Sequence, residues 1–203
     1  MLDLLKQKLR RMYAALAGLS SDDLSVIQPK ITEEFGYSYT EVDFNQHSDE
    51  IALTNSAFLL VTNIASLKDH LKVWCKKQEV AFHGDALINS NKAVALIHDL
   101  WNIDKHAELN STPRSGIKPK LQDIRTALTI TAGTSAGSAA FFSMGPRTGK
   151  ITTGTSGEGS VQLRLAAQIT DEAGNVVADF TQTCSEAVDA WSAALQAAGI
   201  PCP

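Results

Sequence analysis

Two different hydrophobic periodicities meet at one short segment of this chain. Residues 110–119, NSTPRSGIKP, contain two prolines and a glycine, which end helices and favour loops. Before this segment, apolar residues recur every three or four positions, as on one face of a helix; after it, they alternate with polar residues, as in a half-buried strand. The sequence therefore predicts an α+β fold, with a long antiparallel helix pair in the N-terminal half and a C-terminal antiparallel β-meander closed by a helix.

The helical half is expected to hold three main helices. An amphipathic helix opens the chain, and two long helices at residues 50–77 and 86–109 should pack against each other. Residues 20–23 suggest a helix cap followed by a short helix, and residues 36–48 a loop with a short strand at 37–42. The apolar stripe of the first helix consists of Leu2, Leu5, Leu9, Met12, Tyr13 and Leu16.

The second half is expected to form strands near residues 128–131, 139–144, 150–155, 161–169 and 176–180. The turn-forming residues 171–175 predict that the last two strands make a hairpin. Thr183 and Glu186 have the spacing of a capping box, so a closing helix should begin there. Its buried face would consist of Cys184, Val188, Trp191 and Leu195.

Length and composition favour one compact domain with three parts: residues 1–109, a connector at 110–119, and residues 120–203. A chain of 203 residues can bury one sizeable core. No signal peptide or membrane span is expected, and three widely spaced cysteines without a C-x-x-C pair suggest a reducing cytoplasm. A net charge of −4 argues against a protein that wraps nucleic acid. If this chain contacts nucleic acid, the expected place is a local basic group formed by Lys6, Lys8, Arg10 and Arg11.

The densest polar chemistry lies at the end of the second long helix. His98, Asn102 and His106 follow one another at intervals of four residues and share a helix face. The two histidines would be about 12 Å apart along the axis, too far to share a metal ion. We therefore expect a polar cluster that either caps neighbouring backbone or binds a ligand, formed by His98, Asn102, Asp104, Lys105 and His106.

Residues 102–106 resemble the Asn-x-Asp-Lys-His signature found near a helix end in many small, uncharacterised bacterial proteins. Those proteins mostly continue with Arg, whereas Ala107 follows here. The closing segment, with its Cys-x6-Trp spacing, is also similar to the C-terminal helix of some of them. The resemblance covers about a fifth of the chain and implies a structural or binding role for the cluster, with no established activity.

Residues 95–100 resemble the His-Asp helix of HD-type metal-dependent phosphohydrolases. The resemblance implies a divalent metal held by His70, His98 and Asp99, and a metal-bound water that attacks a phosphate ester. The glycine that customarily follows the His-Asp pair is absent, and the family's later aspartate is unassigned.

Residues 50–109 also resemble, in outline, the paired long helices of HEPN nucleases. That family's catalytic Arg is followed by a His four to six residues later, and no arginine of this chain meets that requirement. This resemblance implies a non-catalytic binder.

Together these features predict a non-enzymatic binding or accessory protein of bacterial or phage type. The chain has no G-x-S-x-G, phosphate-binding P-loop or H-E-x-x-H motif, and we expect no cofactor. The expected partner is a protein or a small-molecule ligand, with homodimer formation left open. The alternatives are the HD-like hydrolase and a nucleic-acid-linked accessory of a defence or toxin system, contacting its partner through residues 6–11.

Overall fold

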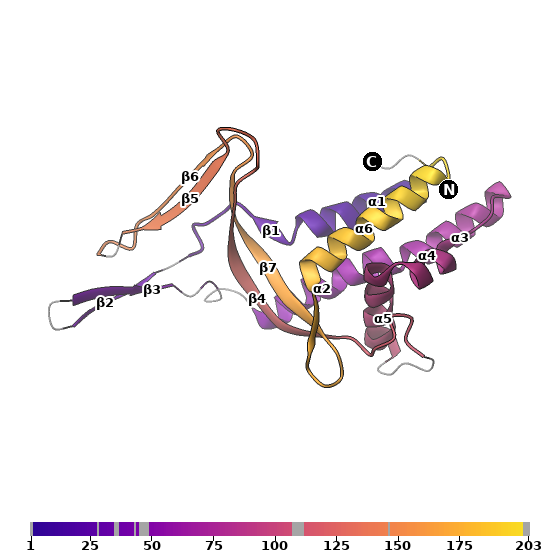
Figure 1. Ribbon diagram of the computed structural model, residues 1–203, viewed down its shortest axis with the longest axis horizontal. Helices are drawn as coiled ribbons and strands as arrows, with labels where there is room; N and C mark the ends of the chain where they lie inside the picture. Colours follow the sequence, from indigo (N-terminus) through magenta and orange to yellow (C-terminus); the bar gives the residue numbers. More distant parts are fainter. Residues whose placement is uncertain are drawn as a thin grey trace. The chain divides into compact units, whose positions relative to one another are not determined.

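The computed structural model describes residues 2–27, 29–34, 37–42, 44, 49–106, 112–145 and 147–200 (Figure 1). Helices dominate the first half, antiparallel strand pairs follow, and a helix ends the described chain, which confirms the α+β class. The chain divides into two compact units. Unit 1 comprises Met1–Leu19, Thr54–Ile124 and Ala166–Pro203; unit 2 comprises Ser20–Leu53 and Arg125–Leu165.

Six helices lie in the described chain. Helix α1 buries Leu5, Leu9 and Met12 as its periodicity predicts. Helix α5 is buried at every position from Ala93 to Leu100, so it is a core helix rather than an amphipathic one. The helices are α1 (Leu2–Ala17), α2 (Glu50–Ala65), α3 (Leu67–Gln78), α4 (Gly84–Ser90), α5 (Lys92–His106) and α6 (Phe180–Ala197).

The closing helix α6 supplies much of the core of unit 1. Its face of Cys184, Val188, Trp191 and Leu195 is buried, as the sequence predicts. Helix α6 packs most extensively on α5. It also lies beside α1 (Figure 1), where Tyr13 Oη and Ser192 Oγ are 2.6 Å apart.

Of the two long helices expected from the sequence, the first is continuous apart from one turn residue and the second is divided. In the first, Ser66 keeps helical angles (φ −70°, ψ −10°), and its N–H still donates to the Thr62 carbonyl at 3.1 Å. The second divides at Asn91. This residue is extended (φ −116°, ψ 115°), ends α4 with its N–H and caps α5 by accepting from the Val94 N–H at 3.0 Å. Residues 107–109 of that expected helix lie outside the described residues.

By length and composition, the stretch Glu50–Gln78 is apolar enough to cross a membrane, and the core helix of a soluble protein passes the same test. Part of this stretch is packed inside unit 1, where the buried residues of α2 and α3 include Leu60, Ile64 and Leu71.

Eight strands form three sheets in the described chain. The largest has the order β1-β7-β4, with β8 also paired to β7; β2 pairs only with β3, and β5 only with β6. The antiparallel β7–β8 hairpin is confirmed. The strands are β1 (Ser20–Ser21), β2 (Lys30–Glu34), β3 (Tyr37–Glu41), β4 (Lys120–Thr131), β5 (Ala139–Met144), β6 (Ile151–Ser156), β7 (Ser160–Thr170) and β8 (Val176–Asp179).

Several local expectations were wrong. Residues 20–21 form strand β1, paired with β7, rather than a cap and short helix. Strand β2 was not predicted, and β5 and β6 form a separate hairpin rather than two strands of a continuous meander.

The turn from β6 to β7 requires glycine at Gly159, because an added Cβ would overlap the carbonyl of Ala139.

Helix α6 begins at Phe180, three residues before Thr183. Its N-cap is Asp179, whose Oδ1 accepts from the Gln182 N–H at 2.8 Å. Thr183 instead lies inside the first turn and donates to the Asp179 carbonyl at 2.6 Å. The capping-box prediction was therefore wrong, because an aspartate at the end of the preceding strand satisfies the first free N–H.

Candidate functional site

The polar segment singled out in the sequence separates into an inner and an outer part. His98 and Asp99 lie on the buried stretch of α5, with 8% and 1% of their surfaces exposed. Asn102 is half-buried one turn further on, and Asp104, Lys105 and His106 are exposed. The five predicted residues therefore differ in burial along one helix.

The inner part is held by contacts within α5 itself. The Asn102 Nδ2–H donates to Nδ1 of His98 at 3.0 Å, and the His98 ring meets Trp101 edge-on at 6.0 Å between centroids. The Lys105 ammonium lies 4.9 Å from the Trp101 ring centroid, a cation–π contact. Lys105 also places positive charge at the helix C-terminus, which interacts favourably with the helix dipole. These contacts support a structural role for the helix end.

Asp99 joins α5 to the connector that follows it. Its Oδ2 accepts from both the N–H and the hydroxyl of Ser115, each at 2.7 Å. Burial alone would raise the pKa of Asp99, but the hydrogen bonds outweigh it and hold the pKa below its ordinary value. Asp99 is therefore an ionised anchor for residues 112–119 rather than a proton donor.

The residues implied by the HD-type resemblance are not gathered into a metal site. Among the described residues, no three His, Cys, Asp or Glu side chains lie where they could hold one ion. His70 is exposed on α3, beside Lys8 of α1, while Asp99 is committed to Ser115. Burial and the charge of Lys8 lower the pKa of His70, although Asp69 opposes them.

A pocket of about 290 Å³ lies within unit 1, between α3, the segment leading into α4, and α6. Apolar groups dominate its wall, which includes Leu71, Phe82, Leu87 and Leu195. Small residues on two helices leave the space: Ala86, Ala194 and Ala198. The sequence analysis did not find this pocket because three segments that are far apart in the sequence build it. One sequence signal for the pocket was present: Ala194 and Ala198 are small residues four positions apart, next to the apolar stripe of α6.

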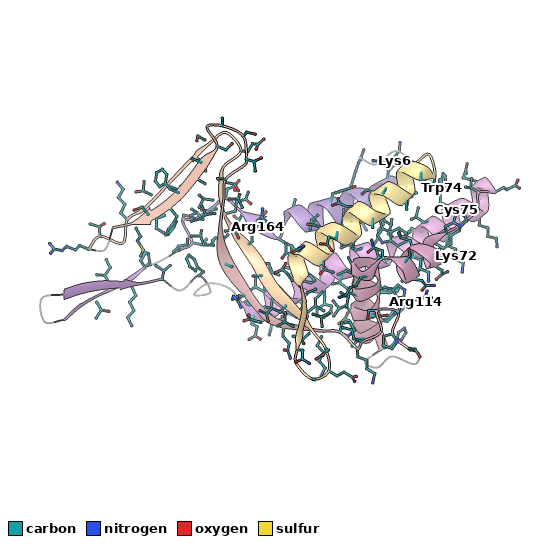
Figure 2. All side chains as sticks on the ribbon, in the orientation of Figure 1. Lys6, Lys72, Trp74, Cys75, Arg114 and Arg164 are labelled. Atoms are coloured by element: carbon teal, nitrogen blue, oxygen red, sulfur yellow. The ribbon has the colours of Figure 1, made fainter. Side chains whose placement is uncertain are left out.

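Helix α4, which forms part of the pocket wall, is connected to its neighbours by ion pairs on its polar side. Asp85 Oδ1 lies 2.8 Å from Lys68 Nζ on α3 and 3.1 Å from Arg114 Nη2 in the connector. Arg114 also donates to Asn89 Oδ1 at 2.7 Å. Figure 2 shows Arg114 beside this part of the helical unit and Cys75 on α3. The pocket is thus preformed, with its short helix tied to two neighbours.

Four polar side chains belong to the pocket wall: Cys75, His83, Ser90 and Trp191. The Ser90 hydroxyl donates to the Leu87 carbonyl at 3.3 Å. His83 is exposed, and Cys75 is buried, which raises the pKa of its thiol. Trp191 is buried, and its Nε1–H has no hydrogen-bond partner among the described residues. None of the lining residues is Lys, Arg, Asp or Glu.

No protein family model, curated protein or solved structure matches this chain.

Proposed function

We propose that this chain is a non-enzymatic binding protein that holds a small, neutral, largely apolar molecule in the pocket between α3, α4 and α6. The observation that carries the proposal is the pocket itself, preformed and walled by apolar side chains. Such pockets with a few polar groups are the usual form of small-molecule sites in proteins.

The wall selects against charge. A carboxylate or ammonium buried there would lose its hydration without an opposite charge to compensate, which costs several kcal/mol. A hydroxyl or carbonyl at one end of the ligand could instead stay near the exposed His83 at the mouth. The fitting ligand class is therefore an alcohol, ketone or similar molecule of modest size.

The pocket is better suited to holding a ligand than to transforming it. Cys75 is a poor nucleophile because its raised pKa keeps it in the thiol form. Among the described residues, no ion pair joins His83 to a carboxylate that would orient it as a base. The lining groups thus supply shape and apolar contact.

The test uses 1-octanol as the probe and octanoate as its charged counterpart. Binding is followed by NMR through the indole Nε1–H resonance of Trp191, which is assigned by its loss in Trp191→Phe. We expect 1-octanol to shift this resonance saturably and octanoate to do so at least about tenfold more weakly.

A matched pair of variants locates the binding. Ala194→Leu fills the pocket and should weaken 1-octanol binding about tenfold or more, whereas Ala193→Leu places the same side chain on the exposed neighbouring position of α6. Equal binding by both variants, or no saturable shift in the wild type, would reject the proposal. Tighter binding of octanoate than of 1-octanol would reject the neutral ligand class.

A further inference from the structure

Helices α1 and α3 concentrate positive charge in a chain whose net charge is −4. Each carries four basic residues and one acidic residue, so together they hold eight of the 18 Lys and Arg residues and two of the 22 Asp and Glu residues. The two helices pack on each other in unit 1. The remaining chain is correspondingly acidic, which makes this pair a distinct electrostatic feature.

Most of these basic groups lack an acidic partner. Lys68 is paired with Asp85, but within the described residues no ion pair involves Lys6, Lys8, Arg10, Arg11, Lys72, Lys76 or Lys77. Lys8 donates to the neutral Asn63 Oδ1 at 3.1 Å. A group of cations left unpaired by the fold is open to an external anion.

Lys8 of α1 lies near His70 of α3, where the two helices are in contact. Burial and then the charge of Arg11 lower the pKa of Lys8, and Lys8 in turn acts on His70 of α3. Asp69 is the acidic residue that faces His70. On α3, Lys77 follows His70 by seven residues and so continues the same helix face. This basic surface, defined as Lys8, Arg10, Arg11 and Lys77, therefore crosses from one helix to the other.

We propose that the basic surface of α1 and α3 binds the phosphate backbone of a nucleic acid. Phosphates spaced along a strand complement cations spaced along two packed helices. Among the described side chains of α1 and α3, the one exposed large hydrophobic residue is Val73. A membrane-surface helix needs a continuous apolar face to insert, which makes an anionic bilayer the poorer match. Figure 2 shows Lys6 of α1 and Trp74 of α3 toward the same end of the helical unit.

The test measures fluorescence anisotropy of labelled RNA and duplex DNA of about 20 nucleotides or base pairs, long enough to cover a surface of this kind. The binding variant is Arg10→Gln/Arg11→Gln/Lys77→Gln. The matched control is Lys92→Gln/Lys120→Gln/Lys150→Gln, which removes the same charge from exposed positions elsewhere. Thermal unfolding of all three proteins verifies that folding is retained.

We expect wild type and control to bind, with affinity falling as salt rises. The binding variant should lose about tenfold or more in affinity, and its slope of log affinity against log salt should be shallower by about two to three. Equal losses in both variants would overturn the proposal, since net charge alone would then explain binding. The proposal would also be overturned if the wild type bound neither RNA nor DNA. Binding to phosphatidylcholine vesicles that contain phosphatidylserine, without binding to nucleic acid, would count as this outcome.

Discussion

Asp99 and Ser115 are joined twice through one carboxylate oxygen: the N–H and the hydroxyl of Ser115 each lie 2.7 Å from Asp99 Oδ2. The serine hydroxyl is also 3.1 Å from the Ile117 carbonyl. The buried carboxylate of Asp99 on α5 is thereby hydrogen-bonded by Ser115, which lies 16 residues later in a loop. The same loop carries Arg114, which contacts Asp85 and Asn89 of α4, the short helix that forms part of the pocket wall.

Ser115→Ala should therefore destabilise unit 1. The substitution removes the hydroxyl and keeps the N–H bond, so the expected loss is about 1–3 kcal/mol in the free energy of unfolding. Urea denaturation measures it. The control is Ser185→Ala, at an exposed position of α6, which should change stability by less than about 0.5 kcal/mol. An unchanged stability in Ser115→Ala would mean that Asp99 is satisfied in another way.

The same carboxylate gives the stability a pH dependence. Burial would raise the pKa of Asp99, but its hydrogen bonds lower it overall, so the folded state favours the ionised form. The resulting stabilisation is complete above the ordinary aspartate pKa of about 3.9 and is lost as pH falls through the lower folded-state value.

Asp99→Asn should accordingly be less stable than wild type at neutral pH and lose less stability on acidification. Urea titrations between about pH 6 and pH 3 compare the two profiles. Asp104→Asn, on the exposed part of the same helix, is the control and should keep the wild-type profile. Parallel profiles for wild type and Asp99→Asn would contradict the assignment.

The two buried thiols should differ in accessibility. Burial and the charge of Asp179 raise the pKa of Cys184, which is fully buried, while Cys75 is 5% exposed and lines the pocket. We expect iodoacetamide to modify Cys75 slowly and Cys184 only on unfolding, because the thiolate is the reactive form. Peptide mass spectrometry resolves the sites. Ala194→Leu should slow modification at Cys75 further, and modification of Cys184 before Cys75 in folded protein would contradict this order.

Asp179→Ala should cost about 0.5–2 kcal/mol of stability, because it removes the acceptor for the Gln182 N–H at the start of α6. Glu186→Ala provides the comparison. Its carboxylate accepts from the exposed Gln182 side chain rather than from the backbone, so its loss should cost less than about 0.5 kcal/mol. Thermal unfolding ranks the two variants. The reverse order would restore the capping box expected from the sequence.

The sequence could predict the elements whose pattern depends on near neighbours. The stripe containing Cys184 and Trp191 marks α6, and the alternation along β7 marks a strand with one buried face. It also located His98 and Asn102, which are one helical turn apart and do contact each other. Local spacing was sufficient in each case.

Features that depend on tertiary position could not be read in this way. Nothing in the periodicity shows that Ser115 would reach Asp99 or that α6 would become the main neighbour of α5. The separate β5–β6 hairpin is another example. The ring of Phe141 covers Gly154 on the facing strand, a cross-strand contact that periodicity does not reveal.

The interleaving of the two units has a consequence for how the chain can be divided. The chain passes four times between them, and both ends of the sequence belong to unit 1. Unit 2 therefore consists of two segments, and each of them is inserted between two segments of unit 1. A cut in the connector at 112–119 would leave parts of both units on each fragment. Reassembly of the fragments would then require association between two chains, with an entropy cost absent from the intact protein.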